Sequence, residues 1–366
     1  MIMKGKSKCW IILMAMAVLC LTSLCACGDK EKDAKEPTSF ELALVTDEVG
    51  VDDGSYLQVT WDAIQKFGEE NGMTCQYYES EDDEDAYLRA IRKARNKGAK
   101  LVVLAGSQFE TVAYKAQKEY EDLYFVLLDG VPRDKDYNYQ TEINSTGVLF
   151  AEEEAGYLAG YAAVCEGYTK LGFMGGSAIP PVKRYGYGFI QGVSAAVNEL
   201  GGSETSIRYA YMGTFEASDE IESEAYSWYD DGIEVIFACG GSIGESVMAA
   251  AETADCKVIG VDADQSSLSD TVITSAKKET GKAITDILKN YKRHNFEGGA
   301  ILNYGAENKG IGLEMTNSRL RVFNMDTYKQ LYREIRNGDR EIVKDIGNKD
   351  VETLAGEKVN VKEVDE

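Results

Sequence analysis

The chain has 366 residues, 44% of them hydrophobic, which is enough for two domains that each bury a core. Its formal net charge is −23, which argues against a nucleic-acid partner because the phosphates would be repelled. The net charge does not decide which ligand an individual cleft prefers.

The amino-terminal segment has the pattern of a bacterial export signal. Lys4, Lys6 and Lys8 form a basic start, and residues 10–24 form an apolar run that is short for a membrane span. The sequence LCAC at 24–27 then resembles a lipobox, in which small residues precede a cysteine that becomes lipidated.

Cys27 fits this pattern better than Cys25, because the small Ala26 precedes it. We therefore expect a signal peptide over 1–26 and a diacylated Cys27 that begins a charged tether over 27–38. A plain secretory signal or an N-terminal membrane anchor is the alternative.

From Phe40 onward, apolar runs alternate with amphipathic ones, as in a doubly wound sheet. In the first half we expect strands at 42–45, 75–78, 101–104, 124–128 and 146–150, with helices at 56–71, 84–97, 109–120 and 151–164. In the second half we expect strands at 171–174, 206–211, 235–238, 258–261 and 271–274.

Two stretches about 130 residues apart share one pattern. In residues 171–197, a short apolar strand ends at Gly175-Gly176, a proline pair rules out helix, and an amphipathic helix begins near Arg184. Residues 41–72 repeat the order of strand, loop and helix. The pattern predicts an α/β protein of two Rossmann-like lobes with parallel sheets, and a ligand cleft between them.

The lobes are expected to exchange segments across a hinge, with crossings near 146–148 and 274–275 and a third beyond Ala300, because no linker-like stretch separates them. The expected N-terminal lobe is 39–147 completed by about 276–305, the C-terminal lobe is 148–275 completed by about 306–340, and 341–366 is a charged tail.

The cysteine and histidine pattern predicts neither disulfides nor a metal site. Cys75, Cys165, Cys239 and Cys256 remain after the signal and Cys27 are set aside, and no Cys-x-x-Cys or Cys/His metal spacing is present. Cys239 and Cys256 would lie roughly 15 Å apart in neighbouring strands, so we expect four reduced thiols. The single histidine, His294, is expected on the surface.

Two acidic runs have an ordinary structural explanation. Residues 79–85 lack the glycine and terminal glutamate of an EF-hand and are expected to be a solvated loop that leads into a helix. Residues 152–154 are three glutamates that open the helix expected at 151–164.

Seven motifs in order resemble the basic membrane protein family of bacterial lipoproteins, over roughly Phe40 to Arg340. They are VDDGSY (51–56), VLLDG (126–130), FAEEEAGYLAG (150–160), GFMGG with GFIQG (172–192), MGTF (212–215), GVDADQ (260–265) and TSAKK (274–278). One departure stands at Tyr56-Leu57, where the family has Phe-Asn, so the aromatic ring survives and the amide is lost.

The resemblance implies the substrate-binding component of a nucleoside ABC importer with the type I periplasmic-binding-protein fold. Expected partners are a small-molecule nucleoside, with purine nucleosides expected before pyrimidine ones, and the permease subunits that receive the nucleoside. The protein would be a monomer without a cofactor, lipid-anchored to the cell membrane on its extracytoplasmic face, and not an enzyme.

A ribose needs a carboxylate acceptor and a cationic donor for its vicinal hydroxyls. Asp262, which follows the strand VIGV, and Lys278, which follows the strand VIT, can supply them. The structural alternative is that Asp262 is a turn or N-cap residue and that Lys278 is solvated.

A flat base needs aromatic faces, and the resemblance places Trp61 and Phe215 there. Tyr56 is a further candidate ligand contact, although Tyr56 and Trp61 also fit a helix core by spacing alone. The remaining expected contacts are Asp52, Asp53 and Asp129 at the base edge and the backbone of Gly240 and Gly241, although Asp129 and the glycines also suit ordinary turns.

Two other functions stay open from the sequence. Asp52, Asp53 and Asp129 would be the carboxylates of a nucleoside hydrolase, but neither a histidine cluster nor a P-loop accompanies them. A surface sensor for another small polar ligand would use the same fold. A repressor core is disfavoured, because an export signal stands where a helix-turn-helix would be.

Overall fold

The computed structural model describes residues 41–47, 50–52 and 54–364. Residues 39–366 form one compact unit. The predicted signal peptide, the predicted lipidation site Cys27 and the candidate ligand residue Asp53 lie outside the described residues.

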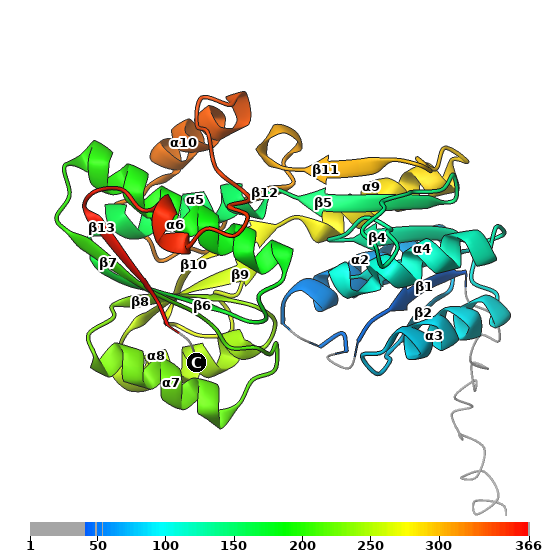
Figure 1. Ribbon diagram of the computed structural model, residues 1–366, viewed down its shortest axis with the longest axis horizontal. Coiled ribbons are helices and arrows are strands. Elements are labelled where there is room, and N and C mark those ends of the chain that lie inside the picture. Colours follow the sequence, from blue (N-terminus) through cyan, green and yellow to red (C-terminus); the bar gives the residue numbers. More distant parts are fainter. Residues whose placement is uncertain (1–40, 48–49, 53, 365–366) are drawn as a thin grey trace, which may run out of the picture. The chain divides into compact units, whose positions relative to one another are not determined.

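The first sheet has six strands, all parallel, in the order β11-β5-β4-β3-β1-β2 (Figure 1). Its strands are β1 (Leu42–Val45), β2 (Cys75–Tyr78), β3 (Leu101–Ala105), β4 (Tyr124–Leu128), β5 (Ser145–Phe150) and β11 (Ile301–Tyr304). Its helical elements are α2 (Tyr56–Asn71), α3 (Glu84–Asn96), η1 (Ser107–Phe109), α4 (Glu110–Glu119) and α9 (Thr280–Lys292).

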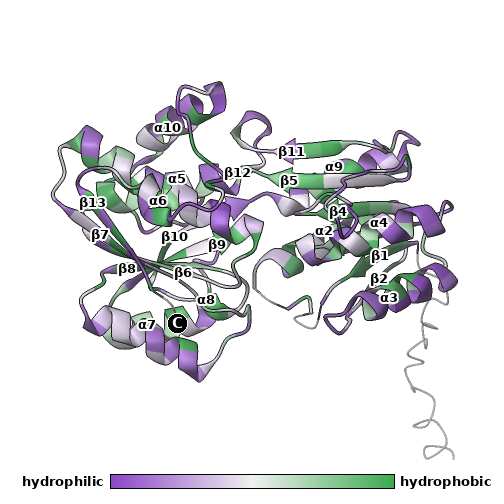
Figure 2. Ribbon diagram, viewed as in Figure 1, coloured by the Kyte–Doolittle hydropathy of each residue, from purple (hydrophilic) through white to green (hydrophobic). Residues whose placement is uncertain are grey.

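Alternate residues of each strand face opposite sides of this sheet, as strand geometry requires. Leu42 and Leu44 pack with α2 and α9, whereas Ala43 and Val45 pack with α3 and α4. Both faces are therefore covered, which explains why these strands read as continuous apolar runs. In Figure 2 the strands are predominantly hydrophobic and the hydrophilic residues lie mainly on helices and loops.

The second sheet has seven strands in the order β12-β10-β9-β8-β6-β7-β13, all parallel except β12. Its strands are β6 (Lys170–Gly175), β7 (Thr205–Tyr211), β8 (Val235–Cys239), β9 (Lys257–Asp262), β10 (Val272–Lys278), β12 (Ile311–Leu313) and β13 (Val359–Glu363). Its helices are α5 (Glu152–Cys165), α6 (Pro180–Leu200), α7 (Asp219–Asp230), α8 (Ile243–Ala254) and α10 (Met325–Asn337). Helices α5 and α6 cover one face and α7 and α8 the other (Figure 1).

Helices α5 and α6 approach each other closely because glycines line their contact. A Cβ atom on Gly156 or Gly160 would overlap the backbone of α6, and one on Gly188 or Gly192 would overlap the backbone of α5. These glycines belong to the motifs GYLAG and GFIQG, so the motifs encode the packing of two helices. Both helices begin at the functional site described below. Helix α6 begins at Pro180 and not near Arg184, so the expectation that the proline pair rules out helix was wrong, because proline is tolerated in the first turn of a helix.

The chain crosses between the two sheets at three places. It leaves β5 for α5 at Ala151, leaves β10 for α9 at Glu279, and runs from β11 to β12 through residues 305–310. The crossings are bonded to one another, because Ala151 N donates to Tyr304 O and Glu279 N donates to Gly310 O, both over 2.9 Å. Strands β5 and β10 run several residues past the crossing positions expected from the sequence.

The last segment, whose structure the sequence left open, packs on the second sheet. Strand β13 pairs with β7, and its Val359 and Val361 are buried in the same core as α5 and α6. The short helical turn η3 (Val351–Leu354) precedes it.

The four cysteines expected to be reduced are all free thiols. No helix within the described ranges combines the length and the apolar character needed to span a membrane.

Candidate functional site

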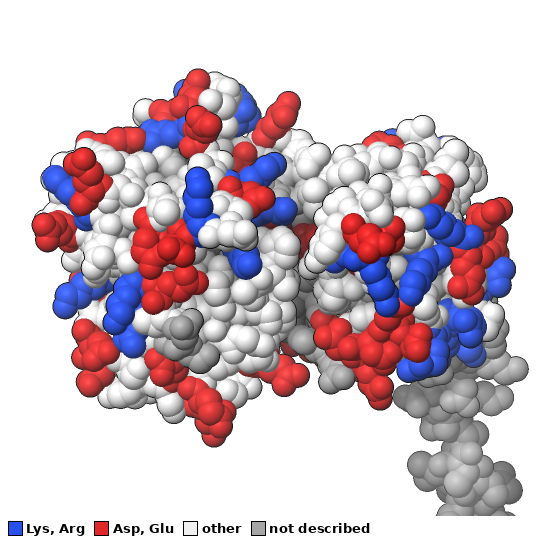
Figure 3. All heavy atoms as spheres, in the orientation of Figure 1, with Lys and Arg blue, Asp and Glu red and all other residues white. Residues whose placement is uncertain are grey.

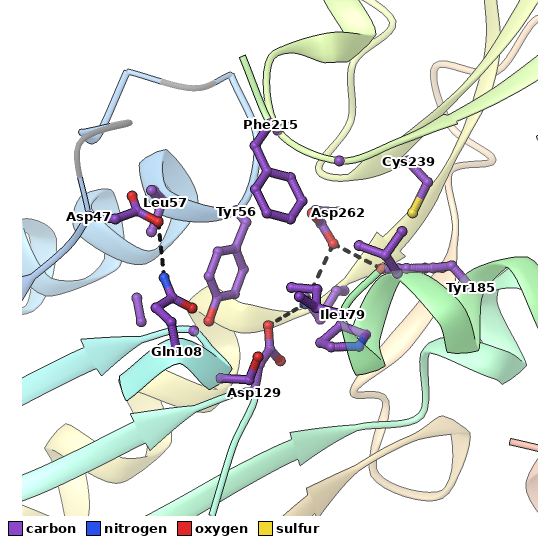
Figure 4. Close-up of a pocket in the computed structure, with 18 residues that line it drawn as sticks. Asp47, Tyr56, Leu57, Gln108, Asp129, Ile179, Tyr185, Phe215, Cys239 and Asp262 are labelled. Atoms are coloured by element: carbon purple, nitrogen blue, oxygen red, sulfur yellow. Dashed lines mark hydrogen bonds and ion pairs between the residues drawn. The ribbon is translucent and has the colours of Figure 1, made fainter. Parts of the chain in front are cut away.

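One cavity is lined by the carboxyl ends of strands from both sheets (Figure 4). The first sheet contributes the ends of β3 and β4, and the second sheet contributes the ends of β8, β9 and β10. Seven of the residues predicted from the sequence line it: Tyr56, Asp129, Phe215, Gly240, Gly241, Asp262 and Lys278.

Among the described residues that line this cavity, Lys278 is the only lysine or arginine. Its side chain is 3% exposed, and its Nζ donates to Asp129 Oδ2 over 2.7 Å. Two more carboxylates lie within ion-pair distance of Nζ, Asp262 at 3.8 Å and Glu152 at 3.7 Å. Burial lowers the pKa of Lys278, but these carboxylates outweigh burial and raise it, so the ammonium stays charged.

Asp262 is held from both sheets. Ser55 Oγ, at the start of α2, donates to Asp262 Oδ2 over 3.2 Å, and the Tyr185 hydroxyl, on α6, donates to Asp262 Oδ1 over 3.0 Å. The dashed lines of Figure 4 mark contacts of this kind around Asp262. The backbones of Asp262 and Asp129 have φ of 61° and 57°, a left-handed conformation that residues other than glycine seldom adopt. Such strain often marks functional positions.

Glu152 also belongs to the site, although the sequence analysis predicted only that it would open a helix. Its side chain is fully buried and accepts from Arg184 Nη1 over 3.2 Å, in addition to its ion pair with Lys278. Burial, opposed chiefly by Lys278, raises the pKa of Glu152 to about 7. One signal was available: the residues after 152–154 are apolar on every side of the helix, which indicates a helix buried all round.

Three aromatic residues line the cavity, Tyr56, Tyr185 and Phe215 (Figure 4). The Lys278 ammonium lies 4.4 Å from the centre of the Tyr56 ring, a distance at which a cation is attracted to the ring face. The predicted pair was Trp61 and Phe215. The structure brings Phe215 together with Tyr56 instead.

Gly240 and Gly241 permit Phe215 to lie where it does. A Cβ atom on Gly240 would stand 2.8 Å from Gly176 N, and one on Gly241 would stand 2.9 Å from Phe215 O. Their φ values of +150° and +55° also favour glycine. The glycine pair is thus explained by close packing at the edge of the cavity.

Three buried polar atoms at the site have no hydrogen-bond partner among the described residues. They are the Tyr56 hydroxyl, Asp129 Oδ1 and Glu152 Oε1, the last of which lies 3.7 Å from Lys278 Nζ. Burial raises the pKa of Tyr56, and the charge of Asp129 raises it further, so the phenol stays protonated beside the carboxylate. A ligand that both donates and accepts hydrogen bonds can satisfy such atoms.

Two predicted residues lie away from the cavity. Trp61 is 8% exposed and packs edge-on against Tyr77, with ring centres 5.2 Å apart, in the core of the first sheet. Asp52 is exposed and does not line the cavity. Periodicity alone allowed the core position of Trp61, and the structure favours that alternative.

The structure adds an amide and a carboxylate that the sequence did not indicate. Gln108 Nε2 donates to Asp47 Oδ2 over 3.0 Å, and both side chains line the cavity on the side away from Asp262 in Figure 4. Leu57, which replaces the family asparagine, lines it too. The described residues contain no group of three or more histidine, cysteine, aspartate or glutamate side chains arranged to hold a metal ion.

A family model described as ABC transporter substrate-binding protein PnrA-like matches residues 40–352 of the chain. The chain belongs to the Bmp family. Its members by that description are substrate-binding proteins rather than enzymes, and the resemblance drawn from the seven motifs is confirmed.

Similar Bmp proteins include the ABC transporter nucleoside-binding protein BmpA of Lactococcus lactis, 29% identical over 84% of this chain and 92% of that protein. Basic membrane protein A of Borreliella burgdorferi is 30% identical over 75% of this chain and 79% of that protein. Among solved structures, a solute-binding protein of an ABC transporter system from Aeropyrum pernix K1 matches with a TM-score of 0.73 at 21% identity, covering 84% of this chain and 94% of that one. These findings confirm the predicted α/β fold of two parallel sheets, of the periplasmic-binding-protein type.

Proposed function

We propose that this Bmp-family protein captures a neutral nucleoside and delivers it to membrane permease subunits. Among nucleosides we propose a preference for purine nucleosides. The observation that carries the proposal is the buried Lys278 ammonium among three carboxylates, beside the Tyr56 ring. The hydroxyls of a ribose can form hydrogen bonds with the ammonium and the carboxylates, and the flat face of a base can stack on the aromatic rings. The nucleoside-binding relative in Lactococcus lactis supports the same choice of ligand.

In this proposal the ribose lies against Asp262 and Lys278, and the base lies against Tyr56 and Phe215. Asp129 would orient Lys278 and offer its unpartnered Oδ1. Contacts of Asp52 and Asp53 with the base edge stay a prediction from the resemblance.

Nucleotides should bind more weakly than nucleosides. A phosphate in this cavity would meet Asp47, Asp129 and Asp262, and the lining offers Lys278 as its single cationic side chain. That cation is already bonded to Asp129.

Titration calorimetry with inosine, guanosine, adenosine, uridine and the matching monophosphates tests this proposal. Truncating one member of a buried charged pair costs about 2–5 kcal/mol, so Asp262→Ala should weaken nucleoside binding roughly 30-fold or more. Trp61→Phe is a matched control, because Trp61 lies in the core beside the site but not in it. Unchanged affinity in Asp262→Ala, or tighter binding of a monophosphate, would defeat the proposal.

The same samples separate the two competing functions. Steady release of free base, followed by chromatography, would identify a nucleoside hydrolase. Mass spectrometry of ligand retained through purification would reveal a different small polar ligand, as the sensor function requires.

A further inference from the structure

A second concave surface lies at the crossings between the two sheets, away from the nucleoside cavity. It is bounded by α10, β12, the start of α9 and the crossing at 305–310, and we call it the basic groove. It is lined by six cationic side chains and a single acidic one, Glu279. The cationic residues are Lys277, Lys282, Lys309, Lys329, Arg333 and Arg336.

Two of these cations are neutralised by nearby carboxylates. Lys277 Nζ lies 3.3 Å from Glu279 and 3.5 Å from Glu314, and Lys282 Nζ lies 2.7 Å from Asp286. The other four, Lys309, Lys329, Arg333 and Arg336, make no ion pair with any residue that the structure describes. All four are exposed.

Three of the unpaired cations share one face of α10. Lys329, Arg333 and Arg336 stand at positions i, i+4 and i+7, which a helix brings to the same side. Like charges at this spacing destabilise an isolated helix. Two tyrosines of the same helix hold it to β12, since Tyr332 OH donates to Ile311 O over 3.1 Å and Tyr328 OH accepts from Leu313 N over 3.5 Å.

The groove is unusual in a chain whose net charge is −23. On the face shown in Figure 3, acidic side chains form several groups with basic side chains between them. In the groove, by contrast, four cations without an ion-pair partner among the described residues line one concave surface beside a single acidic side chain, Glu279, and a bound anion would relieve their mutual repulsion. Guanidinium groups bind the oxygens of a phosphate in pairs, and a lysine adds a point charge.

We propose that the basic groove binds a phosphate-bearing anion. The occupant would contact Arg333 and Lys329 on α10 and Lys309 on the crossing. The groove lies between helices that belong to different sheets. Helix α10 packs against α5 of the second sheet, whereas α9, which begins beside the groove, packs against α2 of the first sheet. The same phosphate chemistry occurs in a free phosphorylated compound and in a phospholipid headgroup, so the experiment has an arm for each.

The first arm measures binding of inorganic pyrophosphate by titration calorimetry at low ionic strength, with a saturating nucleoside present. We compare Lys329→Gln/Arg333→Gln with Lys66→Gln/Arg321→Gln, a control that removes two exposed, unpaired cations elsewhere. All proteins carry Cys27→Ala so that an acyl anchor does not contribute. Loss of two charge-assisted contacts should weaken pyrophosphate binding about tenfold or more in the groove variant, and little in the control.

The second arm measures co-sedimentation with vesicles of phosphatidylglycerol, compared with phosphatidylcholine. Selective binding to phosphatidylglycerol that the groove variant loses and pyrophosphate displaces identifies a lipid headgroup. Binding of pyrophosphate alone identifies a free phosphorylated compound. The proposal fails if the protein binds neither probe, or if groove and control variants lose binding equally. Nucleoside affinity should be the same in all variants, which keeps this outcome separate from that of the proposed function.

Discussion

At the scale of single residues, the site depends on charges that share one buried environment. Lys278 stays protonated because Asp129, Asp262 and Glu152 surround it. For Glu152 the balance is reversed: burial outweighs the nearby charges of Lys278 and Arg184 and raises the pKa of its carboxyl group, so the charged form is unfavourable. The network is therefore expected to respond to pH through Glu152.

We expect Glu152→Gln to flatten the pH dependence of stability. The folded protein holds the Glu152 proton up to a pKa of about 7, whereas the unfolded chain releases it near 4.5. Between these values the folded state binds more protons, so the free energy of unfolding falls as pH rises. Urea denaturation at several pH values should show this fall in the wild type and less of it in the variant. Exposed Glu216→Gln is the control, and equal slopes in wild type and Glu152→Gln would contradict the prediction.

Residue roles were only partly predictable, for physical reasons. Asp262 and Lys278 follow recognisable strands, so their place at the carboxyl edge of a sheet could be inferred. Glu152 was predicted only to open a helix, because a glutamate in the first turn of a helix is usually solvated, and its contact with Arg184 of α6 leaves no local pattern. For Trp61 and Tyr56, helical spacing fits both the core and the cavity, and only the packing against Tyr77 decides.

At the scale of elements, the strands were well predicted and their ends less so. β1, β2 and β4 begin and end at the predicted residues. For β1 and β4 the reason is that buried parallel strands are continuous apolar runs, whereas β2 is a half-buried strand at the edge of the sheet. β10 continues to Lys278, four residues beyond the expected end, because pairing with β9 and β12 extends through its polar residues. Tertiary pairing of this kind leaves no local pattern.

We expect Gly192→Ala to destabilise the protein through the contact of α5 with α6. The added methyl group would overlap the Tyr157 backbone, and overpacking of this kind costs about 1–3 kcal/mol or more. Gly244→Ala in α8 is the matched control, because a Cβ there meets only the end of Met248 at 3.7 Å. The control should be neutral or stabilising by about 0.5–1 kcal/mol. Thermal and urea unfolding measure both, and equal stability of the two variants would contradict the prediction.

At the scale of the whole molecule, both sheets hold the same site. Ser55 reaches Asp262 and Lys278 reaches Asp129, so residues from the first and second sheets are bonded to each other at the cavity. A ligand that contacts both sets favours the arrangement in which they meet. We expect the protein to present its ligand from the membrane surface, which depends on the proposed anchor at Cys27.

Replacing Cys27 with alanine should therefore release the protein from the membrane. Two acyl chains give stable attachment, whereas a chain without them keeps no lipid anchor. Fractionation of cells followed by immunoblotting measures the distribution, with Cys25→Ala as the control that should stay attached. Equal membrane retention of Cys27→Ala and wild type would refute the lipoprotein assignment.

Lys278 is the last residue of β10, and the crossing at Glu279 follows it directly. The backbone of Lys278 therefore lies beside one of the three crossings about which the two halves would turn. A rotation there displaces Lys278 little, while points farther out travel much more. We therefore expect its pairing with Asp129 to persist through opening, which leaves capture to be governed by the distant rim of the cleft.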